Sequence, residues 1–498
     1  MLPRSVILLG LSAAVLLSAW LHRSIFPLEL QGIHNWRQSQ TMWNVYNFVH
    51  QDNNILNPRV SHLNGSNDNL LRYEFPVMQW AIAQVVRLFG HEVATARVCV
   101  FLITVLGALG FYRLLRVMAF GRGVAVSGTI LLLFSPVLYF YSVNVLPDLL
   151  ALAAAIWYLS FVFSYIRTRR AVHLWAAAAF LCLATLAKLP FALFGIVSVV
   201  HFFRLLFSRV GGWRSALAVA GAHLLLITPA VAWYAWVMPG WTDNPVLYGI
   251  FASTNSRGEN LRILHHYADQ YIPYDLLSPA VWLPMLIGVV WPWRPAAGIP
   301  RFRSYLWALA LMTLLYVGLQ WNTINTVHDY YLLPLLPWMY VVATAGLARL
   351  YELVCRFGVP RVGVALLIVL VCAAPVYAYR LRQPAYAVDR SYHYEELQDV
   401  LANAKDLQAA APDEATVIVL NDNALHIFTW LIRKRGYVFW DDSVRPLWIK
   451  DMIDNYGATY LYSTSRRVDD DPGAAPYLDR LIMERGNVRV YRLAPPEG

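Results

Sequence analysis

Charged residues are scarce in this sequence. Of its 498 residues, 14% are charged and 58% are apolar. A water-soluble protein of this size rarely has such a balance, so the sequence predicts an integral membrane protein with lipid around it. The formal net charge of +10 does not indicate a nucleic-acid partner, because the basic residues form short arginine clusters between apolar runs instead of a continuous basic face.

Cysteine is also rare, and the four cysteines form no CxxC pair. All of them lie in or beside apolar runs, where packed thiols are the expected state, so neither a disulfide framework nor a metal site is implied. The sequence has no repeat of fixed period, and its segments do not pair as the inverted repeats of many transporters do.

The N-terminal apolar run lacks a small-residue cleavage site. It covers 5–21 after Arg4, is long enough to cross a bilayer and is interpreted as a retained signal anchor. Ten more apolar runs bring the predicted number of transmembrane helices to about eleven. These runs are 93–117, 123–142, 146–166, 172–188, 190–207, 214–237, 279–295, 303–320, 330–350 and 361–380.

The loops between these runs alternate in charge. One set holds nearly all the arginines, and by the positive-inside bias these loops and the N-terminus are expected in the cytoplasm. The opposite set contains one lysine and no arginine in its short loops, and it also includes the long segments 23–92 and 238–278 and the tail from 381. The arginine loops carry Arg113, Arg116 and Arg122; Arg167, Arg169 and Arg170; Arg204, Arg209 and Arg214; Arg294, Arg301 and Arg303; and Arg349, Arg356 and Arg361.

Two segments fall outside this pattern of spans. The run 76–89 is apolar but short, and counting it would place every arginine cluster outside, so it is expected to lie along the outer interface. In the tail, acidic residues return, and short apolar runs alternate with helix-like stretches. We therefore expect a transmembrane domain over 1–380, with outer loops 23–92 and 238–278, and a soluble α/β domain over 381–498.

Asp148 is the only acidic residue between positions 93 and 240. An ionisable group at such a position is costly and is expected to face a cavity or a partner. Because it follows Pro147, it also fits the first turn of a helix that begins at Leu149. Both interpretations stay open, and they are compatible.

Lys188 is the basic residue of a short outer loop, against the general bias. An ammonium group can meet a phosphate from several directions, so Lys188 is a candidate for binding an anionic headgroup. The alternative is a lysine whose charge reaches the interface while its stem stays in the apolar layer.

The first long loop places polar groups beside segments that enter the membrane. His34, Trp36 and Arg37 lie near its start, and Tyr73 and Glu74 near its end. The two aromatic residues are also typical interfacial anchors. Glu74, next to an apolar Phe-Pro pair, is a candidate for proton transfer.

Two further groups lie on the same predicted side. An amphipathic helix over 259–271 carries His265 and His266, which point about 100° apart on a helix and so disfavour a two-ligand metal site. His328, Asp329 and Tyr330 lie at the mouth of a span. Convergence of these side chains on one face is what a site for a lipid-linked anionic substrate requires.

Four motifs follow one another along the chain. They are Tyr-Glu-Phe-Pro at 73–76 with Leu-Phe-Gly at 88–90, Ser-Pro-Val-Leu-Tyr-Phe-Tyr-Ser at 135–142 with Asp148, Leu-Ala-Lys-Leu-Pro at 186–190, and Tyr-Tyr-Leu-Leu-Pro at 330–334. In this order they resemble the motifs of the GT-C glycosyltransferases, in the branch of protein O-mannosyltransferases and the lipid A aminoarabinose transferase (glycosyltransferase families 39 and 83). The chain departs from the family pattern in having Phe75 in place of a lysine and no carboxylate over 36–41, where an Asp-Glu pair is usual; Glu29 lies earlier than that pair.

The resemblance implies a mainly α-helical, polytopic fold of the GT-C type and transfer of a hexose or pentose from a polyprenyl-phosphate donor to an acceptor hydroxyl of a lipid, protein or glycan, with inversion at the anomeric carbon. It also implies that the reaction takes place at the outer face of a bacterial inner membrane, where membrane lipid surrounds the protein. No metal cluster is evident in the sequence, so no cofactor is expected.

These expectations assign a role to each candidate. Lys188, Arg37 and His328 would bind the leaving phosphate, and Glu74, Asp148 or His34 would accept the proton of the acceptor. Alternatives are a transporter or flippase of lipid-linked saccharides, which would carry charges through the span interiors, and a non-catalytic subunit of an envelope assembly. The substrate-lining candidates are Trp36, Tyr73, Asp329, Tyr330 and His265.

Overall fold

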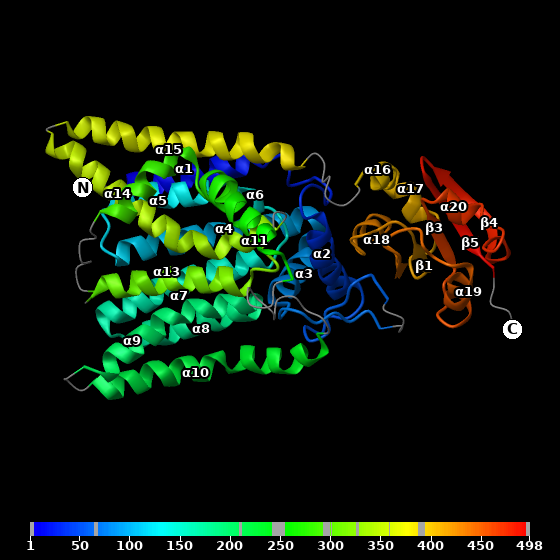
Figure 1. Cartoon of the computed structure of the whole chain (residues 1–498), viewed down its shortest axis with the longest axis horizontal. Coiled ribbons are helices and arrows are strands. Elements are labelled where there is room, and N and C mark those ends of the chain that lie inside the picture. The colour runs from blue at the N-terminus through cyan, green and yellow to red at the C-terminus, as the bar shows by residue number, and fades with distance from the viewer. Residues whose placement is uncertain are drawn as a thin grey trace. The chain divides into compact units, whose positions relative to one another are not determined.

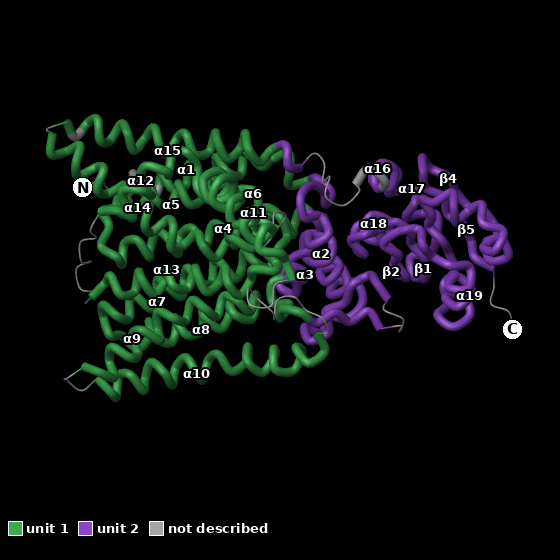
Figure 2. The backbone as a smooth tube through the Cα atoms, viewed as in Figure 1, with its two compact units in different colours: residues 1–27, 73–78, 94–383 green, residues 28–72, 79–93, 384–498 purple. Residues whose placement is uncertain are grey.

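The computed structural model describes residues 4–63, 68–208, 212–241, 254–291, 299, 301–324, 328–357, 359–386 and 394–494. The chain forms two compact units (Figure 2). Unit 1 comprises residues 1–27, 73–78 and 94–383, and unit 2 comprises residues 28–72, 79–93 and 384–498. Residues 28–72 of the first long loop therefore belong to the same unit as most of the tail.

Unit 1 is a bundle of long apolar helices whose axes run mostly side by side (Figure 1). Each apolar run of the sequence is mostly helical over its described residues, although Pro136 divides the run 123–142 because proline has no N–H to continue the helix. The helices are α1 (Arg4–Leu21), α4 (Glu92–Val117), α5 (Arg122–Leu133), α6 (Pro136–Tyr141), α7 (Asp148–Thr168), α8 (Ala171–Ala187), η1 (Leu189–Gly195), α9 (Ile196–Leu206), α10 (Gly212–Val237), η2 (Met238–Gly240), α11 (Arg257–His266), η5 (Tyr267–Leu276), α12 (Pro279–Val290), α13 (Phe302–Leu319), η6 (Asp329–Leu335), α14 (Leu336–Arg356) and α15 (Pro360–Arg382).

The described part of the chain contains seven helical segments long and apolar enough to cross a membrane. An eighth is possible if the pair Arg257–Leu276 and Pro279–Val290, bent by 112°, is one broken span. Shorter apolar helices cover Leu9–Leu21, Arg122–Leu133 and Ala171–Ala187, and also Val77–Phe89. The mainly helical polytopic fold is confirmed, and the number of eleven crossings stays a prediction.

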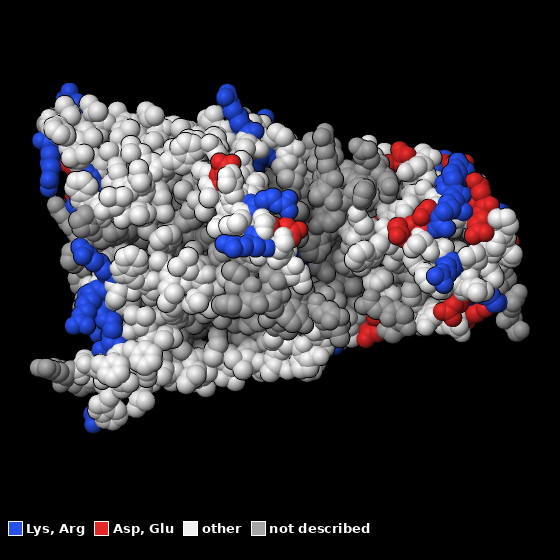
Figure 3. Space-filling view, in the orientation of Figure 1, with Lys and Arg blue, Asp and Glu red and all other residues white. Residues whose placement is uncertain are grey.

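Arginines gather at one end of the unit 1 bundle, as the blue atoms at the left of Figure 3 show. Hydrogen bonds tie neighbouring helix ends together there. Arg167 donates to the carbonyl of Val117 at 3.5 Å, and Arg204 donates to the hydroxyl of Ser304 at 3.4 Å. The loops that share a charge character in the sequence therefore share one end of the fold.

Helices α12 and α14 approach each other through glycine. A Cβ on Gly346 would lie 1.8 Å from the carbonyl oxygen of Pro284, and one on Gly288 would lie 2.1 Å from that of Val342. Both distances are far inside van der Waals contact. Small residues are what lets two helix backbones pack this closely where no water drives them together.

Unit 2 has a five-stranded sheet in the order β2-β1-β3-β5-β4. The first three strands are parallel, and β5 and β4 run antiparallel to their neighbours. The α/β pattern of the tail is thus confirmed. The elements are α2 (Asn35–His50), most of α3 (Val77–Phe89), η7 (Gln383–Tyr386), α16 (Tyr394–Ala402), α17 (Ala404–Ala409), β1 (Thr416–Val419), α18 (Ile427–Ile432), β2 (Arg435–Val438), α19 (Pro446–Asp454), β3 (Tyr460–Ser463), α20 (Arg466–Asp469), η9 (Ala475–Tyr477), β4 (Leu478–Arg485) and β5 (Val488–Leu493).

The first long loop adds to the edge of this sheet. The Leu63 N–H donates to the Gly436 carbonyl at 2.9 Å, and the Gly436 N–H donates to the Ser61 carbonyl at 3.0 Å. Leu63 is also buried in the sheet's hydrophobic core. The loop therefore covers the edge strand β2, whose backbone groups would otherwise be open to pairing with another chain.

We expect Gly346→Ala to destabilise the protein by about 1–3 kcal/mol, because the added methyl group overpacks the contact between α12 and α14. The measurement is thermal unfolding of the purified protein in detergent. Gly221→Ala in α10 is the matched control, since a Cβ there meets nothing within 4 Å and should leave stability unchanged or slightly higher. Equal unfolding temperatures for the two variants would contradict the close packing.

Candidate active site

Lys188 lies at the C-terminal end of α8. Its backbone is extended (φ −160°, ψ 113°), and the helix stops there because Pro190, two residues later, has no N–H to continue it. The carbonyl groups at a helix C-terminus favour a cation. The sequence thus places the ammonium group at a helix end that stabilises it.

Asp148 is the first residue of α7 and forms an ion pair with Lys188. The lysine Nζ lies 3.2 Å from each carboxylate oxygen. The side chains are 3% (Asp148) and 12% (Lys188) exposed, so both charges are largely removed from solvent. Asp148 thus has a partner, one of the two surroundings expected for an ionisable group there, and it also lies in the first turn of a helix.

Two stacked tyrosines cover the other side of the lysine. The Nζ of Lys188 lies 4.9 Å from the ring centre of Tyr331 and 5.6 Å from that of Tyr330, within the range of cation–π attraction. The two ring centres are 4.6 Å apart. His328 meets both rings edge-on at 5.9 Å. The motif 328–331 therefore lies beside Lys188.

A second buried ionic cluster lies next to these rings. Arg382, at the end of α15, contacts Asp275 at 3.0 Å and Asp329 at 2.9 Å. Tyr141 donates a hydrogen bond to Asp329, and its ring centre lies 5.9 Å from that of Tyr330. The three charged side chains are 6–11% exposed. The ring contact between Tyr141 and Tyr330 joins the Arg382 cluster to the Lys188 cluster.

Glu74 lies beside the turn that carries Lys188. The Phe75 N–H donates to the Leu186 carbonyl at 3.0 Å, and the Trp233 indole N–H donates to the Tyr73 carbonyl at 3.0 Å. These bonds hold the backbone on both sides of Glu74, whose side chain is partly buried. The backbone that carries Glu74 is thus fixed against the residue two positions before Lys188.

The remaining predicted residues lie elsewhere. His265 is exposed on α11. Unit 2 holds His34, Trp36 and Arg37, with a buried His34 at φ 61° preceding α2 and Arg37 donating to the side chain of Gln40. The structure therefore brings Glu74, Asp148, Lys188, His328, Asp329 and Tyr330 into one region of unit 1, and it describes His34, Trp36 and Arg37 with the other unit.

Three charged residues escaped the sequence analysis. Asp275 lies in the predicted loop 238–278 and Arg382 in the predicted tail from 381, yet Arg382 contacts both Asp275 and Asp329. Arg97, inside an apolar run, is buried and donates to the Val143 carbonyl at 2.9 Å and the Asn144 side chain at 3.1 Å. It therefore holds the loop that leads to Asp148. A charge inside an apolar run is the signal that could have identified Arg97.

This region can bind an anion and place a base beside it. An ammonium group has three N–H donors, so Lys188 can hold Asp148 and still donate to a phosphate oxygen. The tyrosine rings offer a surface for a sugar or a lipid chain. Within the described ranges, no three His, Cys, Asp or Glu side chains group closely enough to hold a metal ion; metal-independent chemistry stays a prediction.

We expect Arg382→Met to destabilise the protein by about 3–5 kcal/mol, because two buried carboxylates lose their cation. Thermal unfolding in detergent measures the loss. Arg380→Met is the control, since Arg380 is exposed on the same helix. Adding Asp275→Asn and Asp329→Asn to the Arg382→Met variant should restore part of the stability. A fully stable Arg382→Met variant would show that this cluster is not what holds the helix ends together.

Comparisons with known proteins bear on this geometry. Residues 74–236 match the family model described as dolichyl-phosphate-mannose-protein mannosyltransferase. No curated protein matches the sequence significantly. The matched segment begins at Glu74 and includes Asp148 and Lys188, so the family likeness covers one half of the site.

Solved structures resemble the whole chain. ArnT from Cupriavidus metallidurans bound to undecaprenyl phosphate superposes with a TM-score of 0.65 at 14% identity, over 99% of this chain and 98% of that one. The arabinofuranosyltransferase AftD from Mycobacteria gives 0.60 at 16% identity over 99% and 40%. The oligosaccharyltransferase AglB from Archaeoglobus fulgidus, with an inhibitory peptide and a dolichol-phosphate, gives 0.56 at 12% over 95% and 72%. The chain therefore has the fold of the GT-C glycosyltransferases, as its motifs predict.

Proposed function

We propose that this multi-pass membrane protein transfers a hexose or pentose from a polyprenyl-phosphate donor to an acceptor hydroxyl, with inversion at the anomeric carbon. The observation that carries the proposal is the buried Lys188–Asp148 pair beside Tyr330 and Tyr331. The backbone of Phe75, next to Glu74, bonds to that of Leu186 near this pair. Two structures of the same fold, ArnT and AglB, contain undecaprenyl phosphate and a dolichol-phosphate. Both ligands carry the phosphate that an ammonium group would bind.

Lys188 would bind the phosphate, and Asp148 would position Lys188. Because both oxygens of Asp148 lie 3.2 Å from Nζ, this carboxylate is committed to the lysine and is poorly placed to take a proton as well. Placing a cation where the leaving phosphate gains charge lowers the barrier to cleavage. His328, at the edge of the two tyrosines, and Arg37 are further candidates for contacting the phosphate.

Glu74 would act as the general base. The acceptor oxygen forms a bond to the anomeric carbon, the bond from that carbon to the phosphate oxygen breaks, and polyprenyl phosphate leaves with the electron pair. The acceptor proton passes to the Glu74 carboxylate. His34 stays an alternative base. Tyr73, Trp36, Tyr330, Asp329 and His265 are the candidates for lining the sugar and the lipid path.

The proposed location is the bacterial inner membrane, with the site on its outer face. Arg116, Arg167 and Arg204 lie at the helix ends of one side of unit 1, whereas Lys188, Asp275 and Arg382 lie at the helix ends of the other. The positive-inside bias places the arginine-rich end and the N-terminus in the cytoplasm, and the tail over 381–498 outside. This orientation gives the site access to a lipid donor and to an extracytoplasmic acceptor.

We expect Lys188→Ala to reduce kcat for sugar transfer by about 10²–10³-fold, the range found for removing one group that stabilises the transition state. The assay is turnover by purified protein with a labelled polyprenyl-phosphate sugar. Lys405→Ala, at an exposed position of α17, is the control. Asp148→Asn should mainly raise the KM for the donor, and Asp148→Glu should recover part of the affinity. Full activity of Lys188→Ala and Asp148→Asn would overturn these roles.

Reporter fusions test the orientation. Alkaline phosphatase fused after the C-terminal residue should be active, because this enzyme folds in the oxidising space outside the inner membrane. A fusion truncated after Arg169 should be inactive. The reverse pattern would contradict the proposed orientation without bearing on the site chemistry.

A further inference from the structure

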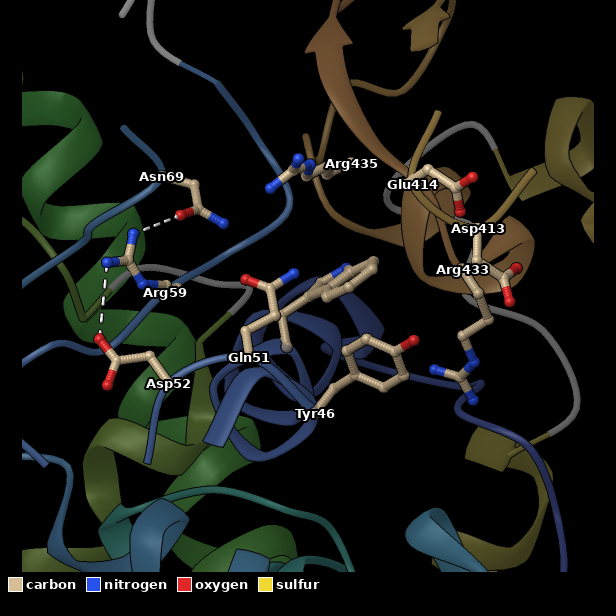
Figure 4. Close-up of a pocket in the computed structure, with 10 residues that line it drawn as sticks. Tyr46, Gln51, Asp52, Arg59, Asn69, Asp413, Glu414, Arg433 and Arg435 are labelled. Atoms are coloured by element: carbon tan, nitrogen blue, oxygen red, sulfur yellow. Dashed lines mark hydrogen bonds and ion pairs between the residues drawn. The ribbon is translucent and has the colours of Figure 1, made fainter. Parts of the chain in front are cut away.

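A pocket of about 400 Å³ lies wholly within unit 2. One wall comes from the first outer loop, with Trp43 and Tyr46 on α2, and the other comes from the tail, with Glu414 before β1 and Arg435 on β2. Figure 4 shows side chains from both segments around the same space. The volume falls in the range of sites for small ligands.

Two buried donor atoms of the lining side chains, one from each wall, lack hydrogen-bond partners within the described part of the protein. The side chain of Trp43 is 2% exposed, and its indole N–H is one of them. The other is Nη1 of Arg433, a side chain that is 19% exposed and stacks over Trp430 with its guanidinium carbon 3.4 Å from the ring centre. Leaving a buried donor unpaired costs about 1–3 kcal/mol. An oxygen-bearing ligand would remove that cost.

The pocket presents acceptors as well as donors. Arg59 forms an ion pair with Asp52 at 3.6 Å and donates to Asn69 at 3.0 Å (Figure 4). Asp413 contacts Lys434 at 2.8 Å, which lowers the pKa of this carboxyl. Hydrogen bonds from Asn54 and Asn57 lower the pKa of Asp52. Both aspartates are therefore ionised near neutral pH.

The charges of the lining side chains balance. The lining contains three arginines, at 59, 433 and 435, and three carboxylates, at 52, 413 and 414. Arg433 also contacts Glu29 at 3.7 Å and Glu92 at 3.9 Å through Nη2. A phosphate accepts hydrogen bonds only and would be repelled by the carboxylates. An apolar ligand would leave the donors unpaired. A ligand whose groups both donate and accept satisfies the two kinds of lining together.

We propose that this pocket binds an uncharged saccharide. Hydroxyl groups donate to the carboxylates and accept from Trp43, Arg433 and Arg435, while the ring of Tyr46 provides an apolar surface for the C–H face of a sugar. The identity of this saccharide as part of the glycosyl acceptor rests on the proposed function. Binding itself does not depend on transfer.

Saturation-transfer NMR on the full-length protein tests the proposal. The protein is purified in a zwitterionic detergent without sugar headgroups, and the probes are methyl glucoside, methyl mannoside, methyl galactoside, methyl arabinofuranoside and N-acetylglucosamine. We expect at least one probe to bind. The double variant Arg435→Ala with Glu414→Ala should weaken that binding at least tenfold, since both residues are exposed and their loss should leave the fold intact.

The matched control is Arg480→Ala with Asp479→Ala, which removes the same charges from exposed positions of β4. It should bind the probe as the unaltered protein does. Absence of binding by every probe, equal binding in the pocket variant, or displacement of the probe by inorganic phosphate or a short peptide would each overturn the proposal.

The transfer assay separates this result from the proposed function. Loss of saccharide binding with intact cleavage of the lipid donor would overturn the pocket alone. Saccharide binding in a protein that never consumes the donor would overturn the transferase and leave the pocket as a sugar site.

Discussion

Pairing of buried charge is the constraint on which the rest of unit 1 depends. Arg382 ends one helix and meets Asp275 and Asp329 from two other segments, at 3.0 and 2.9 Å. An unpaired ion in this apolar bundle would cost several kcal/mol, so each helix end must lie where its partner can reach it. The ion pairs thus fix how the helix ends meet, and apolar packing alone would allow them to slide.

The same requirement shapes the chemistry of the site. Asp148 keeps Lys188 in place, and the two tyrosines limit where its ammonium group can turn. A cation that is already positioned does not need to reorganise as charge develops on a leaving group, which is the condition for effective electrostatic catalysis. A Lys188 paired only with water would be more mobile and less useful.

Much of unit 1 could be predicted because its determinants are local in sequence. The length of the apolar runs predicts the helices, and the arginines predict one end of the bundle. A lone Asp148 or Lys188 in apolar surroundings is conspicuous, because a charge there costs free energy. Asp275 and Arg382 carry no such signal, since each lies at the edge of an apolar run, where charged residues are common. Their meaning appears only when α15 brings Arg382 beside η5, a contact that no local pattern encodes.

Unit 2 shows the same limit on a larger scale. Composition predicts an α/β tail, but it does not reveal that residues 28–72 complete the fold of that tail. The contact between Ser61 and Thr429 spans 368 positions, and both hydroxyls are buried at a mutual distance of 2.8 Å. Such a bond forms only after both segments have folded, so the sequence carries little sign of it.

This arrangement has a consequence for specificity. The pocket of unit 2 has one wall from the first loop and one from the tail, so a substitution in either segment changes the same lining. Unit 1 holds the ionic groups that suit a phosphate, which any polyprenyl-phosphate donor would share. Unit 2 holds a charge-balanced lining that suits hydroxyl groups, whose pattern differs from one saccharide to another. We therefore expect unit 1 to carry the chemistry that the fold shares and unit 2 to select the acceptor. Unit 2 can then vary without disturbing the buried ion pairs of unit 1.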